Sequence, residues 1–199
     1  MTDNIILASE SPLAEKLLKN AGINVELQAA DLDDGALEAP LVETGSSPED
    51  VALVVAEAKA TEISGRNSGA IVLGCKQVLA LDDEILRGPA DMDEGRKRLL
   101  LLSGRSHQVN SAAVVARDGK VVWRRVGVAR LTMCKLDPGY IGRYLARVGP
   151  SALQSPGVNA IDGEGIQLFS EIDGDYFTIL GLPLLDVLAE LRRLRIIDR

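Results

Sequence analysis

Two serines near the start of the chain, Ser9 and Ser11, have the chemistry and the spacing to hold phosphate. They follow a short apolar run that predicts a buried strand over Ile5–Ala8, and Ser11-Pro12 is typical of a helix N-cap followed by proline at the first helical position. A strand-to-helix junction of this kind presents backbone N–H groups and the positive end of a helix dipole. Most such junctions bind nothing, so a phosphate site and a plain helix cap both remain open.

A lysine, Lys59, falls on what should be the inner side of a helix. Ser47-Pro48 predicts a helix start, and Val51, Val55 and Lys59 follow at intervals of four residues, which places them along one face. The lysine either extends from the edge of the apolar stripe into water or points inward to do chemistry. The periodicity alone does not separate these two interpretations.

A second lysine, Lys76, directly follows a cysteine, Cys75, in an apolar stretch. A neighbouring ammonium can stabilise a thiolate, but adjacent residues of a strand point to opposite faces. We therefore interpret Cys75 as a small buried residue and not as a nucleophile.

The composition excludes several classes of protein. The chain has 199 residues with 22 basic and 29 acidic side chains, so its net charge is −7, and no basic patch that could attract a nucleic acid polymer is visible. One histidine and two cysteines exclude a disulfide scaffold and a zinc site built from Cys and His. No apolar run reaches the roughly 18 residues of a membrane span, and the first residues lack the basic start of a signal peptide. We expect a single domain over 1–199, in the cytoplasm and with no membrane partner.

Strand-like and helix-like segments alternate along the chain, which predicts an α/β protein with a mixed sheet. Asp118-Gly119, between the long β-rich runs 106–116 and 121–133, is a strong signal for a two-residue hairpin turn. The polar segment between the acidic stretch 31–34 and Ser46 predicts a surface loop. The other expected strands are 5–8, 23–29, 70–81 and 166–169, and the expected helices begin at Ser11, Ser47, Asp91, Asp137 and Leu184.

Several ordered blocks of the sequence resemble the Maf family of nucleoside triphosphate pyrophosphatases, which is related to the inosine triphosphatase fold. They follow one another over nearly the whole chain, and the resemblance implies a long mixed β-sheet with flanking helices and a cleft between two lobes. The blocks are Leu7-Ala8-Ser9-Glu10-Ser11-Pro12, the acidic stretch from Asp31 to Asp34, Ser47-Pro48-Glu49 to Ala58-Lys59-Ala60, Ser103-Gly104-Arg105-Ser106-His107, Gly174-Asp175-Tyr176-Phe177 and Gly181-Leu182-Pro183-Leu184.

At the positions that carry the family's chemistry, this sequence departs from the pattern. The two arginines that follow the family's Ser-x-Ser-Pro opening are Leu13 and Ala14 here, and the lysine of its Gly-Lys-Pro motif is Gly88. Lys76 stands at the position of the catalytic aspartate. Pyrophosphate hydrolysis needs a base or a metal-held water, and a protonated lysine supplies neither. We expect position 76 to be non-functional in catalysis, since only a strongly lowered pKa would make its lysine a base.

The resemblance also assigns the remaining site residues. It implies that Ser9, Ser11 and Lys59 bind the nucleotide and that Asp34 lies on the metal side, with Mg²⁺ or Mn²⁺ as the cofactor. An ammonium at position 76 would oppose that metal, because two unit charges ~4 Å apart repel by about 4 kcal/mol at an effective dielectric constant near 20.

Two further positions, Gln77 and Asp162, bear on the choice of base. Glutamine after the catalytic position, together with an acidic partner, resembles the subgroup that acts on 7-methylated guanosine triphosphate. A carboxylate suits guanine because it accepts hydrogen bonds from the donor edge of that base.

Two hypotheses of different class follow. The first is a Maf-type pyrophosphatase that converts a nucleoside triphosphate to the monophosphate and pyrophosphate with altered or residual activity. The second is a noncatalytic relative, a pseudoenzyme, that binds a small-molecule nucleotide or a protein partner linked to cell division. The sequence leaves the oligomeric state open, a homodimer included.

Overall fold

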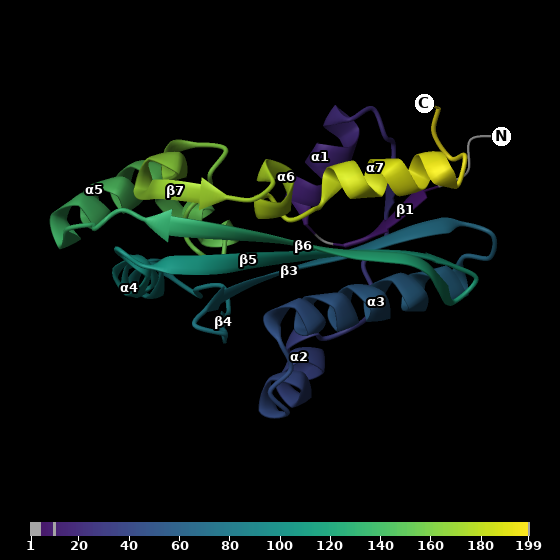
Figure 1. Cartoon of the computed structure of the whole chain (residues 1–199), viewed down its shortest axis with the longest axis horizontal. Helices are drawn as coiled ribbons and strands as arrows, with labels where there is room; N and C mark the ends of the chain where they lie inside the picture. The colour runs from purple at the N-terminus through teal and green to yellow at the C-terminus, as the bar shows by residue number, and fades with distance from the viewer. Residues whose placement is uncertain (1–4, 10, 199) are drawn as a thin grey trace. The chain divides into compact units, whose positions relative to one another are not determined.

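The computed structural model describes residues 5–9 and 11–198, and Glu10 of the opening motif lies outside them. Strands and helices alternate along the chain, as expected (Figure 1). In chain order they are β1 (Ile5–Ala8), α1 (Pro12–Asn20), β2 (Glu26–Leu27), α2 (Asp34–Glu43), α3 (Pro48–Arg66), β3 (Ile71–Leu81), β4 (Glu84–Leu86), α4 (Met92–Leu102), β5 (Ser106–Arg117), β6 (Lys120–Met133), α5 (Pro138–Val148), two 3-10 helices (Gly149–Gln154 and Glu164–Leu168), β7 (Phe169–Asp173), α6 (Tyr176–Ile179) and α7 (Leu184–Arg193).

The strands form one mixed sheet in the order β2-β1-β3-β5-β6-β7, with β4 paired to β3 off this path. Strand β1 is parallel to both β2 and β3, whereas β4 and β7 are antiparallel to their partners. The register places Ala8 opposite Gly74, so the end of β1 lies beside the centre of β3. The predicted α/β fold with a mixed sheet is confirmed.

The chain divides into two compact units. Of the described residues, those up to Gln77, Asn110–Val128 and those from Asp175 onward form the first unit, and Val78–Val109 with Ala129–Gly174 form the second. Strands β3, β5 and β6 each contribute residues to both units. The single domain over 1–199 and the cleft between lobes stay predictions.

In the first unit, a close approach of helix α3 to strand β3 determines where the side chains of both elements point. A Cβ atom on Gly74 would lie 2.3 Å from the backbone oxygen of Ala56 and 2.9 Å from the Cβ of Ala60. Only glycine fits at this contact, because real Cβ atoms do not approach other atoms so closely. Helices α2 and α3 cover one face of β3, and α1, α6 and α7 lie on the other (Figure 1).

The hairpin between β5 and β6 has the predicted two-residue turn. Asp118 and Gly119 have φ angles of 51° and 72°, the left-handed values that a type I′ turn requires. The turn is anchored on the end of α3, since the Gly119 N–H donates to the Ser64 Oγ at 3.0 Å.

Three expectations about the elements were wrong. The segment expected to be a loop up to Ser46 contains helix α2, because the Asp33 side chain caps it by accepting hydrogen bonds from the Gly35 and Ala36 N–H groups. The strand expected over 23–29 has only two residues, and the one expected over 166–169 is largely 3-10 helix, with β7 following it. No helix in the described part of the chain is long and apolar enough to cross a membrane.

Candidate functional site

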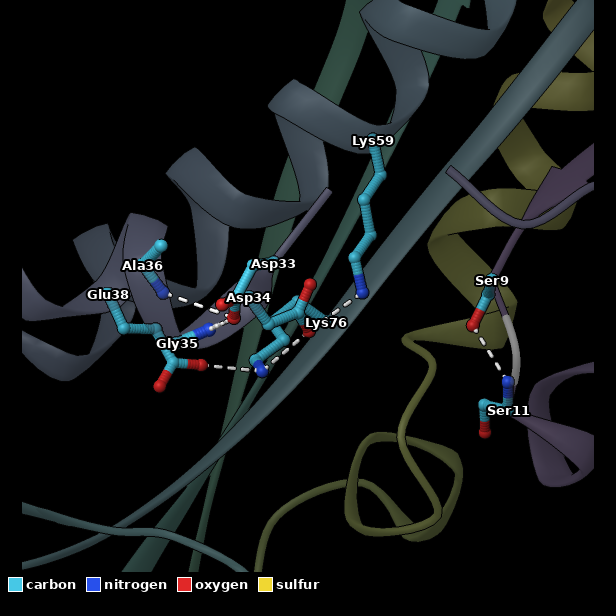
Figure 2. Close-up of polar contacts among 9 residues, drawn as sticks. All are labelled: Ser9, Ser11, Asp33, Asp34, Gly35, Ala36, Glu38, Lys59 and Lys76. Carbon is cyan, nitrogen blue, oxygen red and sulfur yellow. Dashed lines mark hydrogen bonds and ion pairs between the residues drawn. The ribbon is translucent and has the colours of Figure 1, made fainter. Parts of the chain in front are cut away.

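Four charged side chains of the first unit form one ion-paired cluster (Figure 2). The Lys76 Nζ lies 2.9 Å from the Asp34 Oδ2 and 2.6 Å from the Glu38 Oε1. The Lys59 Nζ lies 2.8 Å from the same Asp34 oxygen. The structure therefore brings together three of the predicted site residues, Lys59, Lys76 and Asp34, and adds Glu38.

Helix α2 supplies both carboxylates of the cluster. Asp34 is its first residue and Glu38 follows four positions later, so both side chains project from one face. The Asp33 cap determines where the helix begins, and the positive end of the helix dipole favours a carboxylate at Asp34. Glu38 is nearly buried, with a side chain only 7% exposed.

Helix α3 presents Lys59 on its inner side. Ser47 caps this helix by accepting a hydrogen bond from the Asp50 N–H at 3.1 Å, and Val55 and Val51, one and two turns before the lysine, are fully buried. The Lys59 side chain is only 16% exposed and reaches Asp34 instead of bulk water. The side chain therefore points inward, and its role in binding a nucleotide stays a prediction.

Successive residues of strand β3 point to opposite faces of the sheet. Gly74 faces α3, and Lys76, two residues later, lies on the same face. Cys75 and Gln77 point the other way. Cys75 is buried as expected, and burial raises the pKa of its thiol. The Gln77 Nε2 donates hydrogen bonds to the Ile179 and Thr178 carbonyl oxygens at 2.9 and 3.4 Å, so this amide joins β3 to α6.

The environment of the cluster keeps Lys76 protonated. Burial by itself disfavours a charged lysine, but the hydrogen bonds to Glu38 and Asp34 outweigh it and raise the pKa of Lys76. For Asp34, burial acts to raise the pKa, and the hydrogen bonds from Lys59 and Lys76 lower it more strongly. A lysine whose pKa is raised in this way stays protonated at neutral pH.

The residues at this place do not fit a divalent cation. Metal ions bind carboxylate oxygens at about 2.0–2.6 Å, and the Lys76 ammonium already lies between the two carboxylates at a comparable distance. Within residues 5–9 and 11–198, no three or more His, Cys, Asp or Glu side chains gather into a group that could hold a metal ion.

The two serines lie at the N-terminus of α1, apart from the lysine cluster (Figure 2). The Ser9 Oγ accepts a hydrogen bond from the Ser11 N–H at 3.1 Å, and the Ser11 Oγ caps the helix by accepting one from the Ala14 N–H. Ser11 is thus the N-cap that the sequence predicts. The Ala14 side chain is only 1% exposed, so the position of a family arginine is here part of the core.

The second unit holds the remaining residues of interest. Asp162 is exposed in the turn before the 3-10 helix Glu164–Leu168, and its role in base selection stays a prediction. His107 is buried against Phe169, with ring centroids 5.9 Å apart, and neither ring nitrogen has a hydrogen-bond partner among the described residues. Burial lowers its pKa to about 4, so the ring is neutral and structural.

Glu38 is the member of the cluster that sequence reasoning missed. The segment was expected to be a loop because it is polar and contains Gly35, and in a loop no spacing relates Glu38 to Asp34. The available signal was Asp33, a residue type typical of an N-cap, followed by a stretch with Ala36, which favours helix.

Comparisons with known proteins agree with the order of the sequence blocks. The family model described as Maf-like protein matches residues 4–194. The chain is 64% identical over 198 residues, 100% of both chains, to a 7-methyl-GTP pyrophosphatase of Mesorhizobium japonicum, and 57% identical with the same coverage to one of Brucella abortus. It is 43% identical over 191 residues, 96% of both chains, to a nucleoside triphosphate pyrophosphatase of Roseobacter denitrificans.

Proposed function

Because the chain belongs to the Maf-like protein family, we propose that it binds a guanine nucleotide of the 7-methyl-GTP type and hydrolyses it at no more than a trace rate. The nucleotide class rests on two relatives that are 64% and 57% identical to this chain over their full length and are named 7-methyl-GTP pyrophosphatases. The observation that carries the loss of hydrolysis is the pairing of Lys76 with Asp34 and Glu38.

The phosphate groups of the nucleotide belong, in this proposal, at the N-terminus of α1. Ser9 and Ser11 lie at this end, where the helix dipole and backbone N–H groups favour phosphate. Lys59 supplies a positive charge from α3, although its ammonium is shared with Asp34. Leu13 and Ala14 add no charge, so the triphosphate is held more weakly than by two arginines.

The guanine base is assigned to the carboxylate of Asp162. An exposed carboxylate can accept hydrogen bonds from the donor edge of guanine, which uracil does not offer in the same pattern. Gln77 supports this role through its place in the sequence, and its Nε2 hydrogen bonds fix the orientation of the side chain.

Hydrolysis is lost because the site lacks both a base and a place for a metal. A protonated Lys76 cannot take a proton from water. It also repels a nearby cation, because two unit positive charges ~4 Å apart repel by about 4 kcal/mol at an effective dielectric constant near 20. Asp34 cannot replace the missing base while two ammonium groups lower its pKa.

The same sequence similarity over the full length favours a second candidate function, which is hydrolysis of 7-methyl-GTP. A chain 64% identical to a named 7-methyl-GTP pyrophosphatase could retain that activity through residues outside the Lys76 cluster. This candidate predicts turnover with Mg²⁺ or Mn²⁺, whereas the first predicts binding that does not need a metal.

The test measures pyrophosphate release and binding side by side. With Mn²⁺ and 7-methyl-GTP or GTP, we expect no release above background, while equilibrium binding of GDP in EDTA is retained and exceeds that of UDP. The Mesorhizobium japonicum relative, assayed in parallel, controls for substrate and metal quality. A turnover number near the typical enzyme value of about 10 s⁻¹ would establish the second candidate. Equal weak binding of GDP and UDP would refute the nucleotide assignment.

A further inference from the structure

The geometry of the Lys76 ammonium is that of a cation shared by two carboxylates. Its Nζ contacts one oxygen of Asp34 and one of Glu38, which lie on the same face of α2, so this contact joins α2 to β3. We propose that the Lys76 ammonium is a built-in replacement for a divalent cation, which holds α2 on β3 in every state of the protein without a metal. This proposal deepens the proposed function of the same site, but it does not depend on nucleotide binding.

The charges of the cluster sum to zero. Two ammonium groups, Lys59 and Lys76, face two carboxylates, Asp34 and Glu38. A divalent cation placed there would leave two positive charges in excess, so it can enter only if Lys76 leaves. Without the ammonium the remaining three side chains carry one net negative charge, and the oxygens that contacted Lys76 become available as metal ligands.

The burial of the cluster separates it from an ordinary surface ion pair. The side chains of Glu38 and Lys76 are 7% and 18% exposed, so water screens their attraction poorly. The ammonium also reaches both carboxylates at once, which a surface lysine with many rotamers seldom does. A cation that is fixed in this way is part of the fold and does not exchange with solution.

Lys59 provides a matched control, because it contacts the same Asp34 oxygen and carries the same charge. Lys76→Met and Lys59→Met each remove one positive charge from the cluster. If only the net charge mattered, both variants would gain equal affinity for a divalent cation. If the Lys76 ammonium occupies the cation position, only Lys76→Met opens that position.

The experiment titrates Mn²⁺ into nucleotide-free parent protein and variants and measures the free metal by electron paramagnetic resonance. We expect Lys76→Met to bind Mn²⁺ at least about tenfold more tightly than the parent, since the ligand charge around a site tunes metal affinity over several decades. Lys59→Met should stay within about twofold of the parent, because Lys76 still lies between the carboxylates. A Lys76→Met protein with parental affinity, or equal gains in both variants, would overturn the proposal.

A second variant keeps the test decisive if Lys76→Met folds poorly. Lys76→Gln keeps a hydrogen-bond donor of similar reach but has no charge, and its melting temperature should rise with added Mn²⁺ while that of the parent does not. No shift for a folded Lys76→Gln protein would also overturn the proposal. Since no nucleotide is present in either titration, a failure of the binding assay in EDTA leaves these results unchanged.

Discussion

Replacement of Lys76 by methionine tests how much of the stability of the first unit depends on the ion-paired cluster. Methionine keeps the length of the side chain and removes its charge. Glu38 then loses the cation 2.6 Å from its Oε1, while Asp34 keeps its contact with Lys59. The loss of stability should therefore come mainly from the nearly buried carboxylate of Glu38.

The size of the effect follows from the burial of the partners. Removal of one partner from a fully buried ion pair typically costs about 3–5 kcal/mol. We expect about 2–3 kcal/mol here, because Lys76 is 18% and Asp34 31% exposed and Lys59 still neutralises Asp34. For a chain of this length, that loss lowers the melting temperature by about 4–12 °C.

Thermal and urea unfolding of four proteins measure this loss and its origin. They are the parent, Lys76→Met, Glu38→Leu and the double variant, which together form a double-mutant cycle. An apolar pair can replace a buried ion pair at little cost, so the double variant should be more stable than Lys76→Met alone. If Lys76→Met loses less than about 0.5 kcal/mol, or if the two single effects simply add, the cluster does not hold α2 on β3.

Three further predictions concern other parts of the chain. Gly74→Ala on β3 should destabilise the protein by about 3 kcal/mol in urea unfolding, because its Cβ would overlap the backbone oxygen of Ala56 on α3. Gly65→Ala is the control: Gly65 also lies on α3 but has open space around it, so the substitution should stabilise the protein by about 0.5–1 kcal/mol. The pKa of His107 is about 4, below the 6.5 of an ordinary histidine, so the unfolded chain binds the proton more tightly than the folded one. The free energy of unfolding should therefore fall by roughly 3 kcal/mol as the pH drops from 6.5 to 4. His107→Leu should flatten this dependence in acid titrations followed by circular dichroism. Asp162→Ala should reduce the preference for GDP over UDP in EDTA about tenfold, and an unchanged ratio would remove Asp162 from the base site.

The regular elements of the fold could be predicted because their signals are local. Ser11-Pro12 and Ser47-Pro48 mark helix starts through capping chemistry, and Asp118-Gly119 fixes a hairpin through its left-handed backbone angles. Helix α2 could not be predicted in this way. Gly35 and Pro40 both disfavour helix locally, and the capping by Asp33 together with the ion pairs to α3 and β3 overrides them.

For the candidate site, the family resemblance identified positions but not contacts. It placed Lys59, Lys76 and Asp34 in one region, and the structure brings their charged atoms together. The role of Lys76 as a counter-ion depends in part on Glu38, whose side chain lies beside it because α2 is a helix. Information of this kind comes from packing between elements far apart in the sequence, which composition and periodicity do not contain.

The departures from the family pattern reinforce one another physically. A lysine at the catalytic position supplies a permanent cation, so Asp34 and Glu38 no longer need a metal to be neutralised. Without a metal, a triphosphate would lack the charge that its hydrolysis requires, and the cationic clamp that would position it has no catalytic use. Ala14, where the family has an arginine, is packed into the core at 1% exposure, so a guanidinium cannot return there without repacking α1. Reversal of Lys76 to aspartate alone should therefore restore a place for a cation but not the clamp. The proposed loss of turnover therefore follows from all of these positions together, and the stability that we expect Lys76 to add to the first unit does not depend on turnover.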